Sequence, residues 1–184
     1  FIETIWPNIE RALQWIDEYG DSDGDGFYDY ARKTEKRLQT QGWKDSVDAV
    51  FHADGAYAEG PVALCEVQGY VYAAKRHAAK MAAALGRWEL ATTLDLQADA
   101  LKAAFEEAFW CEEIGTYALA LDGRKRQCKV RSSNAGQVLF SGIAAPERAQ
   151  AVADQLLGHE FFTGWGIRTI GASEIRYNPM SYHN

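Results

Sequence analysis

Two aspartates and a tryptophan stand close together between Gly42 and Asp54, in the string GWKDSVDAVFHAD. Asp45 and Asp48 are three residues apart, so in a helix they would share one face. A carboxyl group beside an indole suits sugar chemistry, because the aromatic ring stacks on the sugar while one carboxyl protonates the glycosidic oxygen. The alternative is the first turn of an ordinary helix, where the helix dipole favours aspartate. The spacing alone favours that alternative over catalysis.

Other polar and aromatic residues could also contact a sugar. Glu66 and Gln68 lie in an apolar run, where a buried carboxylate needs partners, so a structural role and a ligand contact are both open. The strings FFTGWGIRTI and YNPMSYHN combine aromatic rings, an arginine and amides, which suit stacking on a sugar and hydrogen bonds to its hydroxyls. A packed aromatic loop would have the same composition. The candidate substrate-binding residues are Trp43, Glu66, Gln68, Trp165, Arg168, Tyr177, Asn178 and His183.

Metal and cofactor motifs are incomplete. The string DSDGDG places Asp21, Asp23 and Asp25 at alternate positions, as in the first half of a calcium loop, but Arg32 stands where a glutamate is required. A tight polar turn is the favoured interpretation, and a calcium site at the three aspartates is the alternative. No histidine has zinc-ligand spacing, and esterase, nucleotide and dinucleotide motifs are missing, so we expect no other cofactor.

The overall composition limits the class of protein. The 184 residues carry a net charge of −7 and are 47% hydrophobic, which indicates one globular domain with a substantial core. The acidic balance argues against nucleic acid and anionic membranes as partners. The three cysteines have no CxxC spacing and cannot all pair, which suits a cytoplasmic protein. The sequence begins without methionine and ends directly after aromatic residues, so we expect a piece of a longer protein, truncated at both ends.

Hydrophobic periodicity predicts a mainly helical chain with short β-hairpins. The predicted helices cover residues 7–19, 61–85, 88–109, 134–143 and 146–157. A short strand is predicted at residues 27–31. The basic stretch 32–37 is predicted to be a solvated loop. The string YALAL at 117–121 predicts a hairpin with 128–131. Paired helices with short connections are typical of a helical toroid or solenoid rather than of a compact bundle.

Several strings resemble the bacterial amylo-α-1,6-glucosidase family, which is similar to the glucosidase domain of glycogen debranching enzymes. They are QGWKDSVDAVFHADG from Gln41, EGPVALCEVQGYVYAA from Glu59, GTYALALDG from Gly115, and FFTGWGIRTI with YNPMSYHN. The resemblance covers essentially the whole sequence. It implies a partial (α/α)6 toroid, with the active site where inner helices and loops meet, and an oligosaccharide or glucan as the substrate.

The resemblance also implies catalytic roles. The Trp-x-Asp motif of the family falls on Trp43 and Asp45, which makes Asp45 the general acid. A related motif, with the acid five residues after the tryptophan, would select Asp48. The family mechanism is inverting, and its second carboxylate follows a continuation of SYHN that this sequence does not contain.

Two further expectations follow from these features. The alternative function is a non-catalytic carbohydrate-binding or scaffold domain on the same helical frame. An incomplete ring of helices would leave apolar faces exposed, from which we expect self-association.

We expect the 184-residue segment alone to show negligible glucosidase turnover. Inversion needs two carboxyl groups about 6.5–9.5 Å apart with a water between them, and the resemblance places the second one beyond Asn184. The measurement is glucose release from α-linked oligosaccharides by the purified segment. Robust hydrolysis would contradict this placement of the base.

Overall fold

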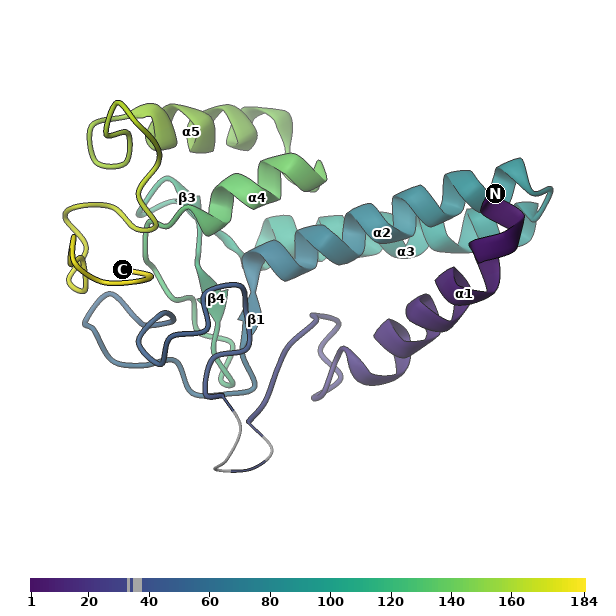
Figure 1. Cartoon of the computed structure of the whole chain (residues 1–184), viewed down its shortest axis with the longest axis horizontal. Coiled ribbons are helices and arrows are strands. Elements are labelled where there is room, and N and C mark those ends of the chain that lie inside the picture. Colours follow the sequence, from purple (N-terminus) through teal and green to yellow (C-terminus); the bar gives the residue numbers. More distant parts are fainter. Residues whose placement is uncertain (33, 35–37) are drawn as a thin grey trace.

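The computed structural model describes residues 1–32, 34 and 38–184, which form the helices and short strands of Figure 1. The helices are α1 (Ile2–Tyr19), α2 (Cys65–Ala84), α3 (Trp88–Ala108), α4 (Asn134–Ser141) and α5 (Pro146–Leu157). The strands are β1 (Ala63–Leu64), β2 (Trp110–Cys111), β3 (Thr116–Tyr117) and β4 (Ala120–Leu121). The chain is mainly helical, as predicted. Most of the predicted loop at 32–37 lies outside the described residues.

The helices pack in pairs around α2. The long helices α2 and α3 form an antiparallel hairpin, and α1 and α4 also pack against α2 (Figure 1). Gly86 follows α2 with a φ of +74°, a left-handed conformation that favours glycine and permits the tight turn into α3. The short strands and long loops gather at the end of the molecule where α2 begins (Figure 1). Among the described residues, no helix is both long and apolar enough to span a membrane.

One apolar core joins the two helical hairpins. Val71 of α2, Phe105 of α3, Val138 of α4 and Val152 of α5 belong to the same buried cluster. Phe105 also lies against the Tyr117 ring, with the centroids 4.8 Å apart. This shared core gives the loops at the start of α2 a fixed base, because close-packed interiors resist displacement.

The predicted start of α2 is wrong, and the predicted hairpin is confirmed in part. Residues 61–64 precede the helix, since Val62 forms a bridge with Tyr30 and Ala63–Leu64 form β1, which pairs antiparallel with β4. The predicted strand at 117–121 is divided between β3, which pairs with β2, and β4. The chain does fold back after β4, since Gln127 forms a bridge with Leu121. The backbone N–H of Leu119 donates to the Cys128 carbonyl at 3.0 Å, and that of Cys128 donates to the Ala120 carbonyl at 2.8 Å, so pairing with Cys128 is confirmed.

Two N-terminal predictions also require correction. Helix α1 begins at Ile2, so Pro7 lies inside the helix rather than in its first turn. Proline removes one backbone donor there, and the helix tolerates it because its apolar side chains are packed against α2. The expected strand at 27–31 is reduced to a single bridge between Tyr30 and Val62.

Gln68 fixes the segment that follows the DSDGDG turn to α2. Its side-chain oxygen accepts the N–H of Tyr28 at 2.9 Å, and its amide donates to the carbonyls of Tyr28 and Leu64 at 2.7 and 3.0 Å. The residue is 0% exposed. Gln68 is therefore part of the scaffold, contrary to the expectation that it contacts a sugar.

We expect Gln68→Leu to lower the free energy of unfolding by about 2–4 kcal/mol, because the backbone groups of Tyr28 and Leu64 lose their partners in a buried place. Urea unfolding measures the change. Gln150→Leu is the matched control, because Gln150 is exposed on α5 and bonds the Asp154 side chain. We expect the control to change stability by less than about 0.5 kcal/mol. Equal losses in the two variants would contradict the scaffold role.

Candidate active site

Residues 42–54, called here the aspartate loop, consist of turns and bends. The helical face expected for Asp45 and Asp48 does not form, and the interpretation as a helix first turn is wrong as well. Gly42 starts the loop directly against the base of α2, where an added Cβ would lie 2.5 Å from Leu64 Cδ1. A larger residue here would require the Leu64 side chain to move. The position of the loop is therefore set by contacts with other segments rather than by local structure.

The residues on both sides of Asp45 are tied to distant parts of the chain. Lys44 is 2% exposed and donates from Nζ to the Thr169 carbonyl at 2.8 Å. The backbone nitrogen and Oγ of Ser46 lie 3.3 and 2.7 Å from Nδ1 of His183. The Asp45 side chain is itself 54% exposed, with its carboxylate 4.0 Å from the same nitrogen. We call the Lys44 and Ser46 contacts the clamp.

Asp48 occupies a different environment. Its backbone carbonyl accepts a hydrogen bond from Nδ2 of Asn184 at 2.9 Å, and the residue is half-buried. The segment that ends in His183 and Asn184 therefore contacts the aspartate loop at two points. Of the two aspartates, Asp45 is the more exposed.

Trp43 stands beside Asp45 with its side chain partly open to solvent. It is 45% exposed, and its ring meets the His183 ring edge-on, with the centroids 6.0 Å apart. The His183 ring also lies against Tyr182, at a centroid distance of 4.2 Å. His183 is only 5% exposed. The structure thus brings together Trp43, Asp45 and His183 from the set predicted by sequence.

A buried layer of opposite charges lies beneath the loop. Glu66, in the first turn of α2, is 1% exposed and accepts a hydrogen bond from Nδ2 of Asn134 at 2.9 Å. Burial raises the pKa of Glu66, against the effect of the Asn134 bond and the Lys44 charge. Burial lowers the pKa of Lys44 to about 8, against the attraction of Glu66. These contacts give Glu66 the hydrogen-bonded core position that was one of its two sequence interpretations.

The Thr169 carbonyl connects this layer to α4. It accepts the backbone N–H of Ser133 at 2.9 Å as well as the ammonium of Lys44. Asn134, the partner of Glu66, is the first residue of α4. The loop, the starts of α2 and α4 and the segment around Thr169 therefore form one connected unit.

The other predicted sugar-binding residues lie in the segment after α5. Arg168 donates to the Tyr177 hydroxyl at 3.1 Å and to two backbone carbonyls of its own segment. The Asn178 side chain accepts a backbone N–H within a turn. Trp165 is 99% exposed at the tip of another turn. Arg168, Tyr177 and Asn178 thus shape this segment, and no described contact joins them to Asp45.

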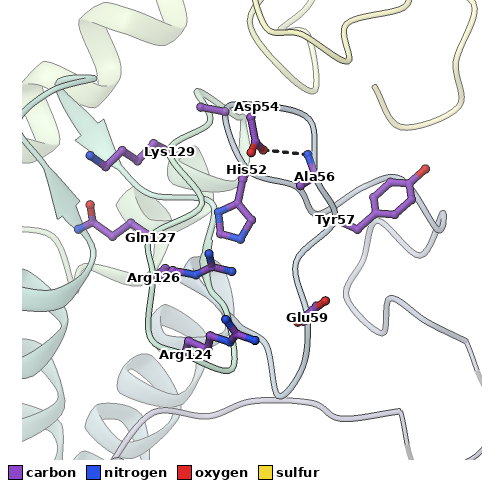
Figure 2. Close-up of a pocket in the computed structure, with 10 residues that line it drawn as sticks. His52, Asp54, Ala56, Tyr57, Glu59, Arg124, Arg126, Gln127 and Lys129 are labelled. Atoms are coloured by element: carbon purple, nitrogen blue, oxygen red, sulfur yellow. Dashed lines mark hydrogen bonds between the residues drawn. The ribbon is translucent and has the colours of Figure 1, made fainter.

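A polar cleft of about 480 Å³ opens between residues 52–59 and 124–129 (Figure 2). Figure 2 shows Arg126 extending toward the loop that carries His52. Beneath them lies Asp122, 1% exposed, whose carboxylate is 3.2 Å from His52 Nε2 and accepts from Arg126 Nε at 2.8 Å. Burial opposes the charge of Asp122, but its hydrogen bonds outweigh burial and lower its pKa. No sequence motif predicted this cleft.

The DSDGDG string forms the polar turn that the sequence favoured. Asp21 accepts backbone N–H groups of its own turn. Asp23 and Asp25 pair with the Lys125 ammonium at 2.5 and 2.6 Å. Carboxylate oxygens of Asp21, Asp23 and Asp29 all lie within 4.8 Å of one another, so the set that could hold a cation includes Asp29 in place of Asp25. Calcium binding here stays a prediction.

Several residues of the site were not predicted from the sequence. A buried lysine has no sequence signal, because lysine is mostly exposed in proteins. Serine and asparagine are common in loops for many reasons, so their types carried no indication either. The unpredicted residues are Lys44, Ser46, Asn134, Thr169 and Asn184.

The buried ammonium predicts a pH dependence of stability. The pKa of Lys44 is lowered from its usual 10.5 to about 8 by burial, so between these values the unfolded chain binds more protons than the folded one. The contribution of Lys44 to the free energy of unfolding therefore rises by on the order of 3 kcal/mol as the pH rises from about 8 to 10.5. Other groups titrate in this range, so the quantity to measure is the difference in urea unfolding free energy between wild type and Lys44→Met. A difference that is constant with pH would contradict the prediction.

Three solved structures contain a similar arrangement of elements. A sialidase matches 97% of this chain with a TM-score of 0.74 and 13% identity, and the matched part is 15% of that chain. The GH78 rhamnosidase of Bacillus sp. GL1 matches 86% with a TM-score of 0.63 and 22% identity, again over 15% of that chain. The GH63 mannosylglycerate hydrolase of Thermus thermophilus, in complex with glucose, matches 64% with a TM-score of 0.52 and 19% identity, over 28% of that chain.

These similarities concern the fold. At such identities they carry no residue roles, and the chain spans about 15% of the length of the first two structures. Together with the paired helices, they confirm the predicted partial (α/α) toroid with short antiparallel strands. A comparison with curated proteins gave no match.

A family model provides the assignment. The model of the mannosylglycerate hydrolase MGH1-like glycoside hydrolase domain matches residues 1–184. It supports the predicted glycoside hydrolase class, and it does not select the amylo-α-1,6-glucosidases within that class. The chain belongs to the MGH1-like glycoside hydrolase family.

Proposed function

We propose that this chain supplies the general acid of an inverting glycoside hydrolase, and that Asp45 is this acid. The observation that carries the proposal is the exposed Asp45 carboxylate on a backbone held on both sides by the clamp. A general acid must reach the leaving oxygen while its own position stays fixed. Asp45 meets both requirements, and the exposed ring of Trp43 beside it can stack on a sugar.

The reaction uses Asp45 in its protonated form. Its carboxyl donates the proton to the glycosidic oxygen as the bond from that oxygen to the anomeric carbon breaks. A second carboxylate removes a proton from a water that attacks the opposite face of the sugar, so the configuration inverts. We propose, as the family resemblance implies, that this base comes from beyond Asn184.

For the substrate we propose an α-linked glucoside in a glucan or oligosaccharide. This choice follows the resemblance of the Gln41–Gly55 and Glu59–Ala74 strings to the amylo-α-1,6-glucosidases. The GH63 structure that resembles the fold is named for mannosylglycerate, which is the alternative substrate to test.

Two further proposals concern the cellular location and the self-association of the protein. The cysteines Cys65, Cys111 and Cys128 are free and buried, which supports a cytoplasmic location. On α1, Trp15 and Tyr19 are 60% and 57% exposed, which supports self-association through this face.

The role of Asp45 is tested in the full-length protein with Asp45→Asn and, as the matched variant, Asp48→Asn. We expect kcat to fall about 10²- to 10⁴-fold in Asp45→Asn, because protonation of the leaving group is lost, while sugar binding is kept. We expect Asp48→Asn to retain most of its activity. Hydrolysis of α-1,6-branched glucans and of mannosylglycerate is measured in parallel.

Each contrary result has a specific meaning. Unchanged turnover in Asp45→Asn would remove Asp45 from the role of acid, and loss in Asp48→Asn alone would transfer that role to Asp48. Sugar binding by the wild type without turnover of either substrate would point to a carbohydrate-binding domain instead. Cleavage of mannosylglycerate alone would exclude the glucan proposal.

A further inference from the structure

His183 is placed to influence Asp45 without itself being open to a sugar. The residue is 5% exposed, and its ring contacts the rings of Trp43 and Tyr182. Its Nδ1 faces the aspartate loop, 3.3 Å from the backbone nitrogen of Ser46 and 2.7 Å from Ser46 Oγ. The Asp45 carboxylate lies further away, at 4.0 Å.

These distances fix the position of the imidazole proton. A backbone N–H is always a donor, so it can point at Nδ1 only when that nitrogen carries a lone pair. A hydrogen on Nδ1 would meet the N–H of Ser46 head-on. The geometry therefore indicates a lone pair on Nδ1 and the ring hydrogen on Nε2, and the Ser46 hydroxyl can add a second donor to the same acceptor.

This tautomer has a consequence for the acid. Because Nδ1 accepts from Ser46, His183 has no hydrogen to direct at the Asp45 carboxylate, which lies 4.0 Å away.

We propose that His183 is a positioning residue for Asp45: as the Nε2–H tautomer it accepts the Ser46 N–H and holds the backbone on the C-terminal side of the acid. This inference rests on the proposed function of Asp45. It replaces the sequence-based expectation that His183 forms part of a sugar subsite. Lys44 performs the corresponding task on the N-terminal side, through Thr169.

The test compares two substitutions in the full-length protein. His183→Leu removes the acceptor, whereas His183→Asn retains one, because Oδ1 of asparagine occupies the place of Nδ1. We expect kcat of His183→Leu to fall about 10- to 100-fold, as for a small displacement of a reacting group, with KM little changed. We expect His183→Asn to recover most of the loss. His159→Leu is the control, because that histidine side chain is 93% exposed.

A different pattern would overturn the proposal. A higher KM with unchanged kcat in His183→Leu would indicate contact with the sugar. Equal losses in the leucine and asparagine variants would show that the acceptor does not matter. An equal loss in His159→Leu would show that the effect is not specific to His183.

A second measurement needs neither activity nor a stable leucine variant. Nitrogen NMR of histidine-labelled full-length protein, with the His183 signals assigned through His183→Asn, shows which ring nitrogen carries the hydrogen. We expect an unprotonated Nδ1 and a protonated Nε2 at neutral pH, and a proton on Nδ1 would overturn the proposal. Full activity in Asp45→Asn would defeat the proposed function while leaving this tautomer result intact, so the two failures are distinguishable.

Discussion

Two buried charged groups, the Lys44 ammonium and the Glu66 carboxylate, are the constraint on which the site depends. Removing either charge from water is costly, and the cost is offset only by their mutual attraction and by good hydrogen bonds. Asn134 supplies such a bond to the carboxylate, and Thr169 supplies one to the ammonium. Because the aspartate loop has no helix or strand of its own, this charged layer determines where the loop lies.

The backbone on both sides of Asp45 is held in place, whereas the Asp45 side chain is open to solvent. Lys44 is held by the Thr169 carbonyl and Ser46 by buried His183, and Asp45 between them remains exposed. Loops can carry reactive groups accurately when rigid elements support them, and here the support comes from the starts of α2 and α4. The Asp122 cluster at the polar cleft follows the same pattern, since a buried carboxylate holds the side chains of His52 and Arg126.

The sequence predicted the regular elements better than the site. Helices α3 and α5 end close to their predicted limits, because an apolar stripe and terminal glycine or proline residues mark them. The predicted start of α2 was wrong because Ala63 and Leu64 pair with β4, a partner that periodicity cannot show. The spacing of Asp45 and Asp48 suggested a helix, and contacts with distant segments overrode it. Gln68 looked like a possible ligand contact, yet its hydrogen bonds all go to the backbone.

The family resemblance pointed to Asp45, but the contacts that hold the backbone beside Asp45 could not be predicted from it. The burial of Lys44 depends on Glu66, Asn134 and the Thr169 carbonyl, which no local pattern connects. The role of His183 likewise depends on a backbone N–H, which every residue except proline possesses. The side-chain types therefore indicated the candidate residues, whereas only the structure showed the contacts that hold them in place.

The contacts of the aspartate loop also have a consequence for the order of folding. Lys44 and Thr169 are 125 residues apart in sequence, Ser46 and His183 are 137 apart, and Asp48 and Asn184 are 136 apart. Closing such long loops costs entropy that the nearby contacts of the α2–α3 hairpin do not incur. The helical hairpin can therefore form early, whereas the loop that carries Asp45, although it precedes the hairpin in the sequence, takes its final shape only once residues 169–184 have docked.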